Sequence, residues 1–313
     1  MLPAGYSWRP ATLDDAPAIQ ALIADHDTKV IGYADGTLDD VRNQLTEPGL
    51  VIDADTWLVH SSDGILAAYA WTYARGTGEY IDLDVITLRP AVREWLFTQT
   101  LGRATELVRA GGHSEATLDI GVYRADTAAS EVVAAHGFHH AATFYRMRVD
   151  HNPDIPPNPV APVGVTLRSG PADLDFRRTA HEVLATSFKG HFGFGPAPFE
   201  RWQDTLEAES TFDWSQLTVA YLDSQPAGIL LTSDSHVEID NCGSVSDLGV
   251  LPFARGQGIA KYLLHTAFAV DLRAGRTGTI LYVDSNNTTG ALRLYEGVGM
   301  RQTLVIDKWC KAI

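Results

Sequence analysis

The sequence predicts an α+β protein with two tandem copies of one domain, each a mixed, mostly antiparallel central sheet flanked by helices. Two observations support this fold class. A proline-rich segment at 151–164 separates two halves of similar length. Landmarks then recur at one offset, since Pro90 and Pro252 lie 162 positions apart, as do Gly137 and Gly299. A repeat of that length indicates a duplicated domain rather than a solenoid unit.

The separating segment reads "DHNPDIPPNPVAPVG" (150–164). Proline fixes φ and has no backbone donor, so this stretch can form neither a helix nor a central strand. We expect an extended, semi-rigid connector. The predicted boundaries are therefore a first domain at 1–150, a linker at 151–164 and a second domain at 165–313.

The two halves predict the same order of elements. A short strand and a helix are expected at 8–23 and again at 167–184. Two apolar strands around a turn follow at 56–73 and at 217–233. A long helix, a strand, a helix and a final strand complete each half, and the long helix returns the chain to a neighbouring strand.

Composition excludes several classes of protein. The net charge of −15, from 24 basic and 39 acidic residues, repels phosphate backbones and mildly favours cationic small molecules. No apolar run reaches about 18 residues and no signal peptide is evident, so we expect no membrane association. Cys242 and Cys310 are too few for a disulfide framework, and the histidines have no metal-ligand spacing. A cytoplasmic protein without a metal is the simplest expectation.

The most informative stretch is "DLGVLPFARGQGIAKYLL" (247–264), in which a strand stops at Pro252 and a glycine loop leads directly into a helix. Unpaired N–H groups at such a helix start form an anion site. Gly256 and Gly258 remove Cβ atoms that would keep an anion from the backbone, and Arg255 adds a cation. The pattern predicts a phosphate or pyrophosphate site, with a merely tight turn as the alternative.

A second motif, "ILYVDSNNTTGALRLYEGVGM" (280–300), decides between them. The two motifs together resemble the GNAT acetyltransferase superfamily, in its tandem, mycothiol synthase-like type. The superfamily loop R/Q-x-x-G-x-G/A is matched by Arg255, Gly258 and Ala260. Its second signature is matched by Asn287, by A-x-x-L-Y at 291–295 and by Gly299-Met300, where methionine replaces phenylalanine.

The resemblance implies acetyl-CoA as co-substrate. The strand before the loop would splay from its neighbour and pair with the pantetheine arm. Asn287 would either contact the cofactor arm or cap its helix. The remaining implied contacts are main-chain groups of Leu248, Gly249 and Val250 and the loop residues Arg255, Gly256, Gln257, Gly258, Ile259 and Ala260.

The resemblance also implies direct attack of an amine on the thioester. Tyr295 is the expected general acid, because a phenol with a pKa near 10 matches a departing thiolate. A core tyrosine is the alternative. The identity of the general base stays open among three carboxylates before the loop, Glu238, Asp240 and Asp247. His236 is a further option.

Substrate selection is expected in "SFKGHFGFGPAPFERW" (187–202), a segment rich in aromatic residues. Its side chains either line an acceptor pocket or pack a proline- and glycine-rich loop into the core. The candidate substrate contacts are Phe188, His191, Phe192, Phe194 and Trp202.

The first copy lacks these features. The offset of 162 places Glu94 at Gly256, Leu96 at Gly258 and Val133 at Tyr295. The carboxylate of Glu94 and the bulky side chain of Leu96 would keep a pyrophosphate from the loop. The aliphatic Val133 has no proton to donate. We expect a degenerate first domain and a catalytic second domain.

The predicted function is acetyl-CoA-dependent N-acetylation of a small-molecule amine by a monomer or homodimer, without nucleic acid. The alternatives are a protein or peptide N-acetyltransferase and a non-catalytic acyl-CoA-binding regulatory protein.

Overall fold

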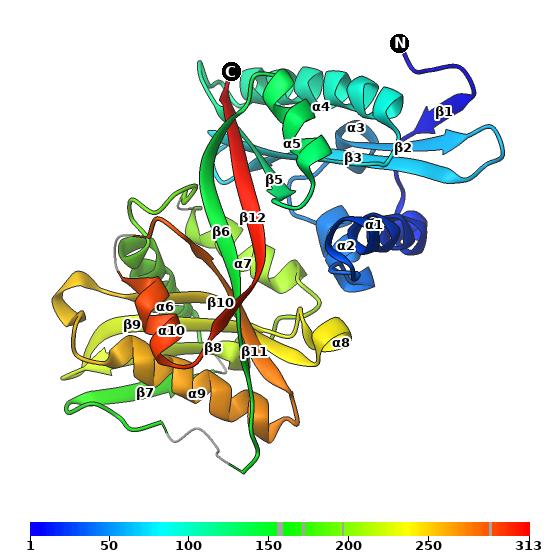
Figure 1. Ribbon diagram of the computed structural model, residues 1–313. Helices are drawn as coiled ribbons and strands as arrows, with labels where there is room; N and C mark the ends of the chain where they lie inside the picture. Colours follow the sequence, from blue (N-terminus) through cyan, green and yellow to red (C-terminus); the bar gives the residue numbers. More distant parts are fainter. Residues whose placement is uncertain (155–158, 171–172, 196, 288–289) are drawn as a thin grey trace. The chain divides into compact units, whose positions relative to one another are not determined.

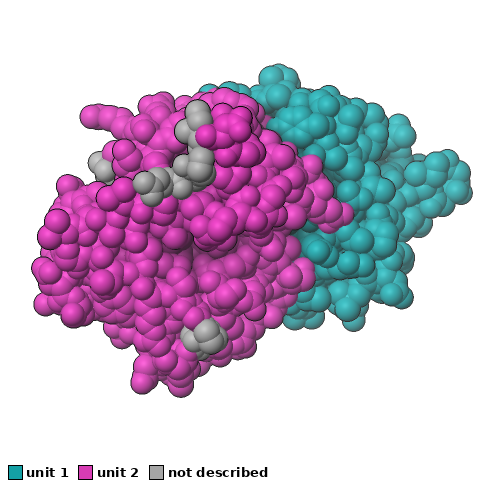
Figure 2. All heavy atoms as spheres, turned by 90° about the horizontal axis from the view of Figure 1, so that it is seen from below, with its two compact units in different colours: residues 1–143, 305–313 teal, residues 144–304 magenta. Residues whose placement is uncertain are grey.

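A computed structural model describes residues 1–154, 159–170, 173–195, 197–287 and 290–313 (Figure 1). Part of the predicted linker, residues 155–158, lies outside the described residues. The chain divides into two compact units, coloured separately in Figure 2. Unit 1 contains residues 1–143 and 305–313, and unit 2 contains residues 144–304.

Unit 1 is a mixed sheet with helices on both faces. The strand order is β1-β2-β3-β4-β5-β12, in which β4 and β5 are parallel and the other neighbours antiparallel. Its strands are β1 (Tyr6–Arg9), β2 (Thr56–Ser61), β3 (Leu66–Arg75), β4 (Tyr80–Ile86), β5 (Thr117–Tyr123) and the end of β12 (Arg301–Ala312). Its helices are η1 (Leu13–Asp15), α1 (Ala16–Ile31), α2 (Leu38–Leu45), α3 (Ile52–Asp55), α4 (Pro90–Ala110) and α5 (Thr127–Ala135).

Unit 2 repeats this plan, with the strand order β6-β11-β10-β9-β8-β7 and β10 parallel to β11. Its strands are β6 (His139–Asp150), from residue 144 onward, and β7 (Val165–Ser169), β8 (Leu217–Leu222), β9 (Gln225–Ser233), β10 (Cys242–Val250) and β11 (Gly278–Asp284). Its helices are α6 (Leu174–Ser187), α7 (Phe199–Ala208), η2 (Trp214–Gln216), α8 (Val237–Asp240), η3 (Pro252–Ala254), α9 (Ile259–Arg273) and α10 (Ala291–Gly297).

Alternation along the strands explains the two helical layers of unit 2. Ile229 and Leu231 of β9 pack with α6 and α7, whereas Leu230 between them packs with α9. Successive side chains of a strand point to opposite faces, so an all-apolar strand has to be covered on both. Pro252 ends β10 because it cannot continue the ladder.

The duplication is visible in the elements. β6 and β12 lie 162 positions apart at both ends, His139 to Arg301 and Asp150 to Ala312. The unit boundaries, however, differ from those expected at 150 and 165. Residues 144–150 pair with β11 in unit 2, and residues 306–312 pair with β5 in unit 1. In unit 1 the strand next to β5 is thus β12, from the end of the second half of the sequence. In unit 2 the strand next to β11 is β6, from the end of the first half.

No helix in the described part of the chain is long and apolar enough to cross a membrane.

Candidate active site

The parallel ladder between β10 and β11 ends halfway along β10. Its last described pair is Val245 with Leu281. The antiparallel ladder to β9 has an irregularity between Val245 and Asp247 and then continues to Val250. A bulge of this kind bends its strand and redirects a side chain. β10 thus separates from β11 after Val245, which is the splay that the resemblance implied.

A cavity of about 280 Å³ lies beside this strand end, and we call it the loop cavity. It is lined by the end of β10, the glycine loop with the first turn of α9, and residues of α6 and α10. The predicted contacts Gln257 and Asn287 are not among its described lining residues. Those residues are Ser187, His191, Leu248, Gly249, Val250, Ala254, Arg255, Gly256, Gly258, Ile259, Ala260, Lys261, Gly290, Ala291, Leu294 and Tyr295.

The loop glycines are required by backbone conformation. Gly256 has φ +76° and Gly258 has φ +81°, in the left-handed region that side chains other than glycine rarely adopt. A Cβ at Gly256 would meet nothing within 4 Å, and one at Gly258 would meet only Cγ of Pro162, at 3.6 Å. Glycine is therefore required at positions 256 and 258 by the backbone conformation of the turn, and not by a close contact with neighbouring atoms.

The start of α9 presents main-chain donors to the loop cavity. The N–H of Tyr262 donates to the carbonyl of Gly258 at 3.0 Å and begins the helical ladder. The N–H groups of Ile259, Ala260 and Lys261 precede it and have no carbonyl one turn earlier. Together with the positive end of the helix dipole, they suit a phosphate.

Arg255 is held against the end of β10. Its Nε donates to the carbonyl of Val250 at 3.0 Å, and Nη2 donates to the carbonyl of Ser187 at 3.4 Å. His191 lines the same cavity, and burial together with the Arg255 charge lowers the pKa of its imidazole. The cation predicted for the rim is thus part of the wall.

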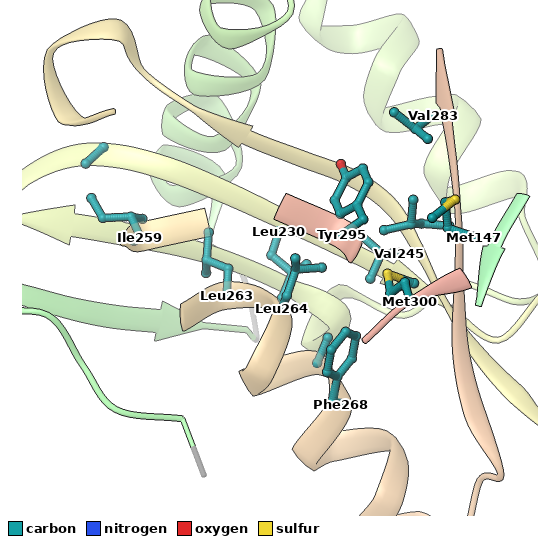
Figure 3. Packing of buried hydrophobic residues seen from close by; sticks show 14 of the residues in the cluster. Met147, Leu230, Val245, Ile259, Leu263, Leu264, Phe268, Val283, Tyr295 and Met300 are labelled. Atoms are coloured by element: carbon teal, nitrogen blue, oxygen red, sulfur yellow. The ribbon is translucent and has the colours of Figure 1, made fainter. Parts of the chain in front are cut away.

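Tyr295 of α10 is 7% exposed and belongs to the core cluster shown in Figure 3. The hydroxyl lies on the side of the ring away from Phe268 and Met300 (Figure 3). Burial raises the pKa of Tyr295 to about 12. Among the described residues none bonds to this hydroxyl, so it is a protonated donor beside the loop cavity.

A second cavity of about 270 Å³ lies on the side of β10 that faces α6 and α7. We call it the acceptor cavity, after the role that we propose for it below. Asp247 lines it immediately after the bulge. Burial raises the pKa of this carboxyl to about 6, and no described side chain bonds to it. The lining residues are His181, Leu184, Ala185, Phe194, Gly195, Ala197, Trp202, Thr205, Leu206, Glu209, Phe212, Leu231, Ser246 and Asp247.

The other candidate bases lie away from both cavities. Glu238 is exposed on α8, and Asp240 pairs with Arg148 at 3.5 Å. His236 bonds to Ser235 and to the hydroxyl of Tyr282, at 3.1 and 3.3 Å. A carboxylate already in an ion pair is a weaker base. Of the four predicted candidates, only Asp247 lines the loop cavity or the acceptor cavity.

The predicted substrate contacts divide between the two cavities. Phe194 and Trp202 line the acceptor cavity, and His191 lines the loop cavity. Phe188 lies between the two groups, with its ring 5.0 Å from that of His191 and 5.5 Å from that of Phe194. Phe192 packs instead against Phe144, at 6.3 Å between ring centroids.

Asn287 does not cap α10. The helix begins at Ala291 with Gly290 in the N-cap position, at φ +81°. The N–H of Asn287 donates to the carbonyl of Asp284 at 3.0 Å, which places Asn287 in the turn after β11. The capping alternative is therefore wrong, while the cofactor contact stays a prediction.

Sequence reasoning missed several cavity residues. Glu209 and Phe212 follow α7 and reach the acceptor cavity, and Ser187 ends α6 beside the loop cavity. A Cβ at Gly249 would lie 2.1 Å from the Ser187 hydroxyl, so α6 crosses β10 closely there. Glu209 and Phe212 belong to no motif, and Ser187 is the first residue of the segment 187–202 but was not among its candidate contacts.

In unit 1 the corresponding loop has become helix. α4 begins directly at Pro90, and the N–H of Arg93 already donates to the carbonyl of Arg89 at 3.0 Å. Glu94 and Leu96 are therefore helical, and their N–H groups enter the ladder. Glu94 bonds to His136 at 3.0 Å and Leu96 is fully buried in the core. The main-chain donors at these positions are therefore bonded within α4, a difference from the glycine loop that the substitutions alone did not indicate.

A sheet with a splayed parallel pair, a glycine loop at the splay and a helix start facing it defines an acyl-CoA-dependent transferase fold. Residues 183–300 match the sequence model of the Acetyltransferase (GNAT) family. Unit 2 therefore contains a GNAT acetyltransferase domain, and the chain as a whole is similar to GNAT N-acetyltransferases. Members of this family take the acetyl group from acetyl-CoA.

Individual relatives agree with this assignment. A mycothiol acetyltransferase of Salinispora arenicola is 29% identical over 253 residues, 77% of this chain and 76% of that one. A GCN5-related N-acetyltransferase of Sphaerobacter thermophilus superposes with a TM-score of 0.80 at 26% identity, covering 100% of this chain and 97% of its own. A tandem GNAT protein of the clavulanic acid pathway shares the fold, with a TM-score of 0.72 at 14% identity over 98% of each chain.

Proposed function

We propose that unit 2 transfers the acetyl group of acetyl-CoA to a small-molecule amine by direct attack. The main support is the position of two consecutive residues of β10. Asp247 lines the acceptor cavity and Leu248 lines the loop cavity. A substrate in each cavity would meet the other at the edge that β10 exposes after its bulge.

Acetyl-CoA fits the loop cavity. The edge of 247–250 offers main-chain groups to the pantetheine amides, and the first N–H groups of α9 suit the pyrophosphate. Lys261, on the same turn, adds a positive charge at the cavity. These are the groups that a thioester with a long polar arm needs for orientation.

Asp247 is the proposed general base. The attacking nitrogen must lose a proton as it bonds to the thioester carbonyl carbon, and that proton passes to the carboxylate. A carboxyl with a pKa near 6 is ionised at neutral pH and accepts a proton more readily than an ordinary aspartate. Its burial without a bonding partner keeps it available to the neutral amine, which is the form that attacks the thioester.

Tyr295 is the proposed general acid. When the carbon–sulfur bond breaks, the departing thiolate takes the phenolic proton. The raised pKa keeps that proton on oxygen until the thiolate forms, and the cavity places Tyr295 opposite the end of β10. The two proton transfers leave an amide and a neutral thiol.

The acceptor cavity favours a small amine with an apolar part. Its volume of about 270 Å³ is close to the lower end for small-molecule sites and has no room for a folded protein segment. Trp202 and Phe212 form apolar walls, and Glu209 with Asp247 adds negative charge that suits an ammonium group. This argues against the protein or peptide acceptor.

The test is an amine screen with acetyl-CoA that detects thiol release. It should include the amine precursor of mycothiol, because relatives are named mycothiol acetyltransferase, alongside aromatic and aliphatic amines. We expect turnover with an amphipathic small amine and a KM for that amine about tenfold higher in Trp202→Ala. Glu238→Gln, exposed on α8, is the matched control.

Acetyl-CoA binding without turnover of any amine would favour the non-catalytic regulatory protein. Turnover of a peptide N-terminus with no effect of Trp202→Ala would favour the protein acceptor.

A further inference from the structure

Unit 1 contains a cavity of about 410 Å³, which is larger than the loop cavity and the acceptor cavity of unit 2. It lies where β4 separates from β5, since their last described pair is Asp82 with Asp119. Helices α1, α2, α4 and α5 and the end of β12 contribute the rest of its wall. A cavity of this volume is within the range of small-molecule sites. We call it the unit 1 cavity.

Arg93 lines this cavity as a buried cation that forms no ion pair with a described carboxylate, and the charge of Asp126 on the same wall acts on it only from beyond ion-pair distance. It is 7% exposed, and its Nη2 donates to the carbonyl of Thr87 at 2.5 Å. Its Nε is buried and has no partner in the described protein, and no described carboxylate lies within ion-pair distance. Burying an unpaired charge costs considerable free energy, so such a group usually has an anionic partner.

Gln44 supplies a second unused donor. Its Oε1 accepts from the hydroxyl of Tyr69, which fixes the orientation of the amide. The Nε2 group is buried and has no partner among the residues described. Gln44 and Arg93 both line this cavity, and an amide nitrogen together with a guanidinium suits the two oxygens of a carboxylate.

Asp84 is the complementary group. One carboxylate oxygen accepts from the N–H of Val85 at 2.7 Å, and no described cation pairs with it. Burial raises the pKa of Asp84 to about 6, which leaves it ionised at neutral pH. It therefore offers a negative charge on the wall of the same cavity.

The remaining charged groups of the wall already have partners. His26 lies between Asp27 and Asp126, at 3.5 and 3.4 Å. Burial alone would lower the pKa of His26, but the hydrogen bonds to Asp126 and Asp27 outweigh it and raise the pKa to about 9. Lys308 pairs with Asp119 at 2.8 Å. Asp40, a further carboxylate of the wall, accepts from the N–H of Thr37 at the start of α2. Arg93, Asp84 and Asp40 are thus the charged groups of the wall for which the described residues supply no ion pair.

We infer that unit 1 binds a small zwitterion of the amino-acid type, with its carboxylate toward Arg93 and Gln44 and its ammonium group toward Asp84. The rest of the wall is largely apolar, which suits an aliphatic portion between or beside the charged groups; it includes Ile23, Val85, Ile86, Phe97, Ile120 and Val133. Acetyl-CoA suits this cavity less well, because the residues at the positions of the glycine loop are helical and their N–H groups are bonded within α4.

The test is calorimetric titration of the full chain, without acetyl-CoA, with L-leucine and its two single-charge analogues. These are 4-methylpentanoate, which lacks the amine, and leucinamide, which lacks the carboxylate. Glycine and 6-aminohexanoate extend the series in length. We expect a zwitterion to bind at least about tenfold more tightly than either analogue of L-leucine.

Arg93→Gln should weaken that binding at least about tenfold, and Asp84→Asn should abolish the preference of the zwitterion over 4-methylpentanoate. Ala129→Phe, which fills the cavity without removing a charge, should block binding even if Arg93→Gln fails to fold. Arg89→Gln, an exposed neighbour, and Trp202→Ala, in the acceptor cavity of unit 2, are controls that should bind normally.

Absence of saturable binding by every zwitterion of the series would overturn the inference. Binding that survives both Arg93→Gln and Ala129→Phe but is lost in Trp202→Ala would overturn it too, since the probe would then occupy unit 2. Neither result would affect the proposed acetyl transfer, which is measured separately.

Discussion

The Nε group of Arg255 donates to the main-chain carbonyl of Val250, 3.0 Å away. The arginine of the GNAT loop motif is exposed and nevertheless connects the loop to the end of β10. Val250 is also the last residue paired with β9, so this bond sets the distance between the strand edge and the start of α9. The proposed pantetheine and pyrophosphate contacts depend on that distance.

Replacing Arg255 with alanine should therefore weaken acetyl-CoA binding about tenfold, close to 1.4 kcal/mol. The loop would lose its bonds to Val250 and Ser187 as well as a nearby positive charge. Calorimetric titration measures the change. Arg273→Ala, at the exposed end of α9, removes an equal charge and should bind normally; an equal loss there would point to a general electrostatic effect.

Tyr295→Phe should reduce kcat by about 100- to 10,000-fold, because the thiolate would leave without a proton donor. The Kd of acetyl-CoA should stay within about twofold, since the ring continues to fill its place in the core. Steady-state rates and calorimetry on the same preparation separate the two effects. Unchanged turnover would remove Tyr295 from the mechanism.

Asp247→Asn should alter the pH dependence of activity. The base has to be ionised, so kcat/KM of the natural protein should rise with pH through about 6, the raised pKa of Asp247. The asparagine variant should have a low kcat/KM that does not rise with pH in this range. A wild-type profile that is flat between pH 5 and 7 would contradict the assignment.

The same carboxyl makes a prediction about stability. The folded pKa lies above the unfolded value of 3.8, so the folded state binds the proton more tightly, and stability falls as pH rises from about 4 to 6. Asp247→Asn avoids this loss. Its free energy of unfolding should exceed that of the natural protein at pH 7 by an amount of the order of 2 kcal/mol, with little difference near pH 4. Urea unfolding at both pH values provides the measurement.

A pair of glycine substitutions tests the packing. A Cβ at Gly243 would lie 2.1 Å from Oδ1 of Asp271, a buried carboxylate that also bonds to Arg276 and Thr279. Gly243→Ala should lower the free energy of unfolding by about 1–3 kcal/mol. Gly102→Ala meets nothing within 4 Å inside α4 and should raise it by about 0.5–1 kcal/mol. Urea unfolding distinguishes the signs.

Much of the fold could be predicted because the two copies of the domain keep matching residues at a constant offset in the sequence. The offset that relates Pro90 to Pro252 also relates β6 to β12. The exchange of these last strands could not be predicted, because two copies of one strand have the same apolar pattern and either could pair with β5 or β11. The local pattern of apolar residues predicts that a strand forms, but it does not show which of two equivalent strands it pairs with.

The site divides in the same way. The glycine loop and Tyr295 were predicted because their motifs are contiguous. The base was left open because Glu238, Asp240 and Asp247 are near one another in sequence and differ only in what surrounds them. The bulge after Val245 separates them in space. Glu209 and Phe212 follow α7 and line the acceptor cavity. No local sequence pattern predicts this position.

The most direct test of the central claim is calorimetric titration of acetyl-CoA into the full chain, with Gly258→Glu alongside. Gly258 has φ +81°, so a side chain there strains the loop, and a carboxylate would repel the pyrophosphate. One site per chain that disappears in the variant is the predicted result. Two sites per chain, or binding that persists in Gly258→Glu, would contradict the assignment of acetyl-CoA to unit 2.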